Sequence, residues 1–269
     1  MKSHNPVLSR LGEAAERERA TAHAPAGPYG QPGMAQPYPS GLGTSSAPPT
    51  VQTMTIDDVV VRTVALLAIT GLAGAAAWIM VPESLVLPVW IGAAMLGLVL
   101  GLVISFARVT NPLVIGAYAV VEGVFLGVVS EYFESRWDGI VLQAAIGTFG
   151  VFFLMAILYK AKVIRATPKF VRGVIAAMLG VFALMLMNWV LSMFGVNTHL
   201  RDGSPLAIGF SIVVIVIAAL TFILDFQQVE DGVRYGLPRK YAWACAFGIL
   251  VGLIWLYLEI LRLLSYFRE

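Results

Sequence analysis

Three acidic residues lie inside stretches of sequence that are otherwise apolar enough to be buried in lipid: Glu122, Asp225 and Glu259. A carboxylate in the middle of a bilayer costs about 2.5–3.5 kcal/mol on insertion scales, so such a residue usually faces a partner or a water-filled path. The chain carries only 16 acids in 269 residues. Three acids in apolar segments therefore indicate where ions or protons could be handled.

Each of the three acids also has a purely structural explanation. Glu122 could accept hydrogen bonds from a serine of a neighbouring segment or from Asn188. Asp225 could stand at the solvated end of its helix. Glu259 precedes Arg262 by three residues, and that spacing permits an ion pair on a single helix.

The elements that carry these residues are predicted to be membrane-spanning helices. Hydrophobic residues make up 58% of the chain and charged residues 13%, a composition outside the range of soluble domains. A helix needs about 20 apolar residues to cross the hydrocarbon core, and uninterrupted runs of this length favour helices over barrel strands. We place seven spans at 59–81, 86–107, 112–133, 139–159, 172–194, 205–226 and 241–264.

The first part of the chain has a different composition. Residues 1–53 are rich in Pro, Gly and Ser and lack a long apolar run, so they cannot bury a core and are predicted to be a disordered tail. The seven-helix domain is expected to cover residues 54–269. Because the tail lacks the apolar centre of a secretory signal, the first span itself should direct membrane insertion.

The distribution of Lys and Arg predicts the orientation. Cytoplasmic connections carry an excess of these residues, and the assignment with a cytoplasmic N-terminus puts 14 of the 18 on the inner side and four outside. Arg108, at the inner end of the second span, is either one of these anchors or the counter-charge of an acidic site. We expect a multi-pass plasma membrane protein, N-terminus in and C-terminus out, with a composition typical of a GC-rich bacterial genome.

Motifs of soluble enzyme chemistry are missing from the sequence. It contains no HExxH pattern, no Cys/His cluster, no GxSxG elbow and no phosphate-binding or dinucleotide-binding fingerprint. The net charge of +2 is small and the basic residues lie in loops, which argues against nucleic acid as a partner. We therefore predict a protein that is not an enzyme and has no resident cofactor. Its predicted partners are the bilayer, cations and protons, and another membrane protein.

Glycines are frequent in the predicted spans, and small residues usually mark close helix packing in membranes. The first three spans contain Gly71, Gly74, Gly92, Gly97, Gly101, Gly116, Gly123 and Gly127.

Depth along the helices can be counted at 1.5 Å per residue. Glu122 lies about 15 Å beyond Pro112, and Asp225 lies about 13 Å before Arg234, so these two acids should have similar heights. Glu259 is nineteen residues beyond Lys240, which nominally puts it in the outer half of the last span. It would reach the level of the other acids only if the seventh helix began in the cytosol.

Three short motifs resemble one known family. Leu224-Asp225-Phe226-Gln227 in the sixth span and Leu256-Tyr257-Leu258-Glu259-Ile260-Leu261 in the seventh resemble the paired signature of the transmembrane Bax inhibitor motif family, and Glu122-Gly123 matches its Glu-Gly element. The resemblance covers residues from about 54 to 268. It implies six helices around a central seventh, and a pH-sensitive calcium leak in which Asp225 and Glu259 share a proton in the closed state. Arg108 would be the counter-ion at the inner end, and Glu122 would line the route.

Two carboxyl groups in contact in a low dielectric cannot both ionise easily, so they titrate as a unit. A shared proton would latch the sixth and seventh helices, and its loss would separate them. Calcium prefers about six to eight oxygen ligands, so Asp225 and Glu259 would give only a weak transit site, as conduction requires. Two alternatives remain: a proton-coupled transporter that uses the same acids, and a non-conducting regulator of a membrane protease or other membrane partner.

Overall fold

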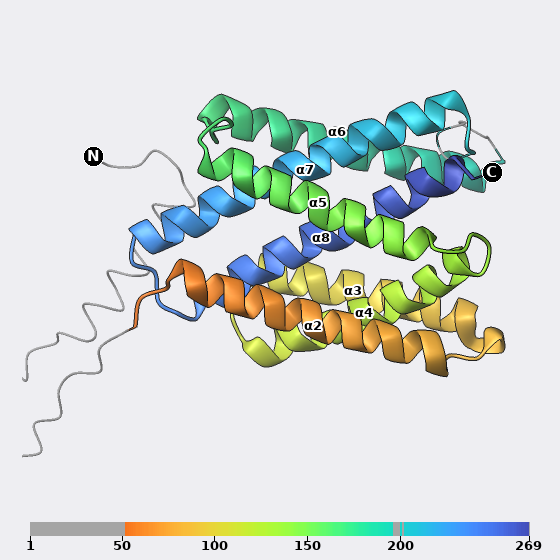
Figure 1. Cartoon of the computed structure of the whole chain (residues 1–269), viewed down its shortest axis with the longest axis horizontal. Helices are drawn as coiled ribbons and strands as arrows, with labels where there is room; N and C mark the ends of the chain where they lie inside the picture. Colours follow the sequence, from red (N-terminus) through yellow and green to blue (C-terminus); the bar gives the residue numbers. More distant parts are fainter. Residues whose placement is uncertain (1–51, 196–199, 201, 269) are drawn as a thin grey trace, which may run out of the picture. The chain divides into compact units, whose positions relative to one another are not determined.

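The computed structural model describes residues 52–195, 200 and 202–268, and this part of the chain is helical (Figure 1). Its seven long helices are all long and apolar enough to cross a membrane. They are α2 (Ile56–Met80), α3 (Val86–Phe106), α4 (Pro112–Glu134), α5 (Ile140–Lys160), α6 (Pro168–Met193), α7 (Pro205–Arg234) and α8 (Tyr241–Tyr266), with a short 3-10 turn, η1 (Glu83–Leu85), before α3. The predicted all-helical, seven-span membrane fold is confirmed. The predicted disordered tail lies outside the described residues, apart from its last two positions.

The starts of the helices follow from local chemistry. A proline in the first turn needs no hydrogen-bond acceptor for its nitrogen, and a preceding polar side chain can satisfy a free backbone N–H group. Helices α4, α6 and α7 all begin in this way, with the capping side chains of Asn111, Thr167 and Ser204 in front of the proline. The turn residues read from the sequence thus end and begin the helices.

Helices α6 and α7 extend furthest beyond their predicted bounds. Helix α6 begins at Pro168 rather than at residue 172, and α7 continues to Arg234 rather than ending at 226. The polar residues after Asp225 kept the sequence pattern from being read as a span, yet backbone hydrogen bonding continues through them. Asp225 therefore lies within α7 and not at its end.

Helix α8 runs between two groups of helices, one formed by α2, α3 and α4 and the other by α5, α6 and α7 (Figure 1). It is the most buried span, since 67% of its most apolar 18-residue stretch lies inside the protein. It packs against α2, α4, α5 and α7, whereas α3 packs on α4 and α6 packs on α7. The resemblance implied six helices around the seventh; here four helices contact it closely and two lie further out.

The group that contains α2 and α4 is held by direct backbone contact. A Cβ on Gly127 would stand 2.2 Å from the carbonyl oxygen of Gly74, and one on Gly123 would stand 2.4 Å from the carbonyl oxygen of Thr70. The Thr70 hydroxyl donates a hydrogen bond to the Ala119 carbonyl oxygen at 3.1 Å. Small residues thus allow these two helices to approach more closely than side chains would permit, as is common in membranes.

Candidate functional site

Asp225 lies on the face of α7 that packs against α8. A Cβ on Gly248 would stand 3.5 Å from the Asp225 Oδ1 atom, so the missing side chain of Gly248 leaves room for the carboxyl group. One turn earlier along α8, Cys245 is also close enough to interact electrostatically with Asp225. Among the described residues, none donates a hydrogen bond to this carboxyl or forms an ion pair with it. It is a partly buried acid, at the contact with the central helix, without a protein partner.

The register of α7 against α8 can be read from two contacts. Phe222 is fully buried, and a Cβ on Gly252 would stand 2.9 Å from its ring. Phe222 therefore faces Gly252, and Asp225 faces Gly248. The two helices run antiparallel, and the Phe222–Gly252 contact lies about one turn away from the Asp225–Gly248 contact. Close packing at Gly252 fixes the position of Asp225 relative to α8.

Glu259 is in a different place. It is 3% exposed, and its Oε1 atom accepts a hydrogen bond from Nη1 of Arg262 at 2.8 Å on the same helix. Glu259 is eleven residues beyond Gly248, which corresponds to about 16 Å along the axis of α8. The antiparallel register puts Asp225 three turns below Glu259, so the structure does not bring the two carboxyls together.

The prediction that Asp225 and Glu259 form a proton-sharing pair is therefore wrong for this structure. The same-helix ion pair, the simpler of the explanations considered for Glu259, is what the structure contains. The prediction of a calcium site formed by these two acids together is wrong for the same reason. In the part of the chain that the structure describes, no three His, Cys, Asp or Glu side chains come close enough to hold a metal ion.

Glu122 points from α4 toward α3. A Cβ on Gly97 would stand 2.6 Å from its Oε1 atom, and the Tyr118 side chain, one turn earlier on α4, is its polar neighbour. The partner is therefore Tyr118 rather than Asn188 or a serine of another span. The Tyr118 ring in turn packs edge-on against Phe247 of α8, with ring centroids 4.9 Å apart.

Glu122 and Asp225 lie on different sides of the central helix. Glu122 approaches α8 through Tyr118, which touches Phe247, while Asp225 approaches the next residue, Gly248. The expectation of similar heights agrees with these contacts. No contact between the two carboxyls is found among the described residues, since α8 separates them.

Arg108 follows the end of α3 in the left-handed backbone region, with φ of 51°. Its side chain is exposed and forms no ion pair with a described acid. The structure therefore does not bring Arg108 to the acidic residues, and its role as an anchor at the inner end of the helix stays a prediction.

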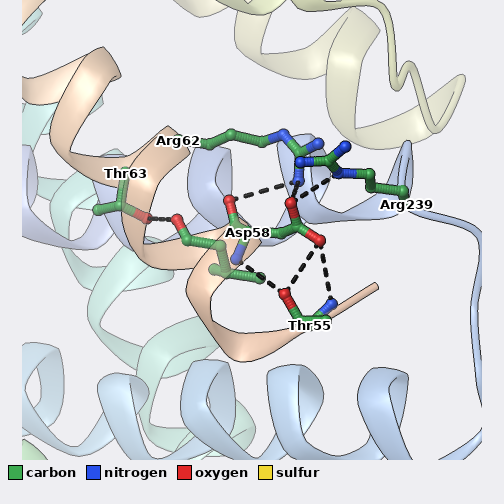
Figure 2. Close-up of polar contacts among 6 residues, drawn as sticks. Thr55, Asp58, Arg62, Thr63 and Arg239 are labelled. Carbon is green, nitrogen blue, oxygen red and sulfur yellow. Dashed lines mark hydrogen bonds and ion pairs between the residues drawn. The ribbon is translucent and has the colours of Figure 1, made fainter. Parts of the chain in front are cut away.

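A polar cluster at the start of α2 was not found from the sequence. Thr55 and Asp58 form a reciprocal capping box, and the Oδ1 atom of Asp58 accepts a 2.7 Å bond from Nε of Arg239 in the α7–α8 connection (Figure 2). Arg62 lies 3.7 Å from the same carboxylate oxygen and stacks on the Trp243 ring of α8. The Thr-x-x-Asp spacing is a signal from which the cap could have been predicted, but the partner 181 residues away is a result of tertiary folding.

A second unpredicted contact joins α5 to α7 at the same end of the bundle. The Tyr159 hydroxyl donates hydrogen bonds to the Glu230 carboxylate and, at 3.2 Å, to Oε1 of Gln227. These polar residues follow Asp225 on α7, where the helix extends beyond its predicted end. The contact therefore ties the end of α7 to α5.

The comparisons with known proteins agree with the sequence motifs. The family model described as Bax inhibitor 1 like matches residues 5–269. The match begins well before residue 54, so it includes most of the tail that the motif resemblance left out. None of the curated proteins compared with the chain matches it. A family match over nearly the whole length, together with seven membrane-spanning helices, shows that this chain belongs to the Bax inhibitor 1 like family.

Proposed function

We propose that this membrane protein is a pH-sensitive calcium leak controlled by ionisation of Asp225 at the contact between α7 and α8. The observation that carries the proposal is the position of this carboxyl: it faces the backbone of Gly248 on the central helix and has no described hydrogen-bond or ion-pair partner. Family membership supports the assignment, because the resemblance of the motifs implies the same activity. The proposal requires no enzyme chemistry and no resident cofactor.

The physical basis is the cost of charge in a low dielectric. A neutral carboxyl group can remain packed against Gly248, whereas an ionised one at this depth is unfavourable unless water or a cation reaches it. Ionisation should therefore favour separation of α7 from α8 and entry of water. The leak is expected to increase as the pH rises through the titration of Asp225, and to decrease on acidification.

A single carboxylate also suits the movement of calcium through the protein. Calcium takes about six to eight oxygen ligands, so Asp225 would supply one or two, and water and backbone carbonyls would supply the rest. Binding of this kind is weak enough for the ion to leave, as conduction requires. Glu122 lies on the other side of α8, so a route that opens between α7 and α8 would pass Asp225 and not Glu122.

The test is calcium flux into liposomes that contain the purified protein, measured over a range of pH. Asp225→Asn keeps the size of the side chain but removes the titration, so its flux should stay at the low, acid-like level at every pH. Asp57→Asn is the matched control, because Asp57 is an exposed acid in the first turn of α2. If Asp225→Asn keeps the wild-type flux and its pH response, Asp225 does not control the leak.

The same liposomes separate the leak from a proton-coupled transporter, which could use the same lone carboxyl group. A leak moves calcium only down its electrochemical gradient. With calcium at equal concentration on both sides and no membrane potential, an imposed proton gradient should therefore produce no net calcium movement. Accumulation of calcium under those conditions would favour the transporter. We further propose a cytoplasmic N-terminus, on the positive-inside asymmetry of the sequence, and the plasma membrane, on the composition typical of a GC-rich bacterial genome.

A further inference from the structure

The inner part of α6 and the facing part of α7 form a groove lined by apolar side chains. Its lining is Phe170, Gly173, Val174 and Ala177 of α6, and Ile217 and Leu220 of α7. Helix α6 packs closely only on α7, and only 11% of its most apolar 18-residue stretch is buried inside the protein. Gly173 contributes to the hollow, because a Cβ placed there would meet nothing within 4 Å.

Five cations lie close in the sequence to the groove residues Phe170 and Gly173. They lie within thirteen residues of one another, at the end of α5, on the α5–α6 connection and in the first turns of α6: Lys160, Lys162, Arg165, Lys169 and Arg172. All five side chains are exposed, and none forms an ion pair with a described acid. The chain has no Asp or Glu between residues 139 and 201.

The acids on neighbouring elements at this end do not neutralise the five cations. Glu230 and Asp231 belong to the last turns of α7, and the Glu230 carboxylate is already engaged by the Tyr159 hydroxyl. The unpaired positive charges therefore remain available at the membrane surface. By the positive-inside asymmetry, this surface is the cytoplasmic one, where anionic lipids attract basic segments.

We propose that the α6–α7 groove and the adjoining cations form a binding site for one anionic phospholipid. An acyl chain would lie along the apolar groove, and the phosphate headgroup would contact Lys169 and Arg172, which flank the groove residues Phe170 and Gly173 on α6. Charge complementarity selects an anionic headgroup, and the apolar lining selects the lipid chain over a free phosphate. This site is separate from Asp225 and does not depend on the proposed leak.

Native mass spectrometry of the purified, delipidated protein tests the site with phosphatidylglycerol and phosphatidylcholine of the same acyl composition. The wild type should bind one phosphatidylglycerol more tightly than phosphatidylcholine. Each basic residue near a membrane surface contributes about fivefold in affinity, so Lys169→Gln and Arg172→Gln should each weaken phosphatidylglycerol binding by about that factor. Gly173→Leu should fill the groove and weaken the binding of both lipids.

Two control variants match these changes. Arg108→Gln removes an exposed cation at the same predicted surface, on the α3 side of the bundle. Gly209→Leu alters a glycine of α7 that also has no neighbour within 4 Å, near the opposite end of the helix. Both should keep wild-type lipid affinity. Helical content from circular dichroism and elution volume establish that each variant is folded.

Three results would overturn the proposal. Equal binding of the two lipids by the wild type would remove the charge selection. Unchanged affinity in Gly173→Leu would mean that the cations attract headgroups without any role for the groove. A lower oligomeric state for Gly173→Leu than for the wild type, with lipid affinity unaltered, would make the groove a contact between copies of the chain. As a second measurement, phosphatidylglycerol should raise the unfolding temperature of the wild type more than that of Gly173→Leu, because a ligand of the native state stabilises it.

Discussion

Removing Arg262 should destabilise the protein strongly, because it leaves the Glu259 carboxylate without its partner. Glu259 is 3% exposed, while the side chain of Arg262 is 27% exposed. Loss of one partner of a buried ion pair costs about 3–5 kcal/mol in free energy of unfolding. We expect about 3 kcal/mol for Arg262→Gln, at the low end of that range, because water already reaches part of the guanidinium side of the pair. Glu259→Gln should cost about 1 kcal/mol, since the remaining arginine can turn toward solvent.

The double variant distinguishes this explanation from a general packing effect. Once Arg262 is Gln, replacing Glu259 by Gln removes the uncompensated charge, so the double variant should be more stable than Arg262→Gln alone. The coupling in the double-mutant cycle should be about 2 kcal/mol. Free energies are measured by reversible unfolding in mixed micelles with increasing dodecyl sulfate, followed by circular dichroism. Additive effects would refute the reasoning, and so would a double variant less stable than Arg262→Gln.

Three further predictions concern contacts between helices. Gly127→Ala should lower the free energy of unfolding by about 1–3 kcal/mol through overpacking against α2, whereas Gly116→Ala, on the same helix with open space around it, should not; equal stability of the two variants would contradict the backbone contact. Arg239→Gln should cost less than about 1 kcal/mol, because its side chain is 53% exposed, and a larger loss in the same unfolding measurement would mean that the cluster at the start of α2 is a structural requirement. Tyr257→Phe should cost about 1 kcal/mol by removing the 2.7 Å hydrogen bond to Ser130, and an unchanged free energy of unfolding would show that this bond contributes nothing net.

The acids show how far a count along the helix can be trusted. The rise of 1.5 Å per residue nominally placed Glu259 in the outer half of the last span, and in the structure, where α8 runs from Tyr241 to Tyr266, Glu259 lies in the C-terminal half of that helix. The pairing of Glu259 with Asp225 came instead from the family signature, which gives the order of motifs but not the register of two helices. That register depends on where Phe222 and Gly252 pack together, and no short motif contains this information.

The glycines give the same lesson for packing. Composition indicated that small residues would mediate close helix contacts, yet the glycines of the first three spans differ in what an added Cβ would meet, which for Gly97 and Gly101 is a side chain. Gly74, Gly123 and Gly127 meet backbone of a neighbouring helix, whereas Gly71 and Gly116 have nothing within 4 Å of an added Cβ. All of them have the same side chain, so only the rotation of each helix about its axis decides which face inward.

By itself, the sequence determined the class of the protein, the number of spans and the family. These properties depend on run length, hydropathy and local turn chemistry, and each is set by residues that are close together in the chain. The tertiary structure decided that α8 is the central helix, that Asp225 faces Gly248 without a partner among the described residues, and that Glu259 is bound to Arg262. The physical reason is that bilayer insertion rewards the apolar character of each segment separately, whereas side-chain partners depend on how the finished helices rotate and slide against one another.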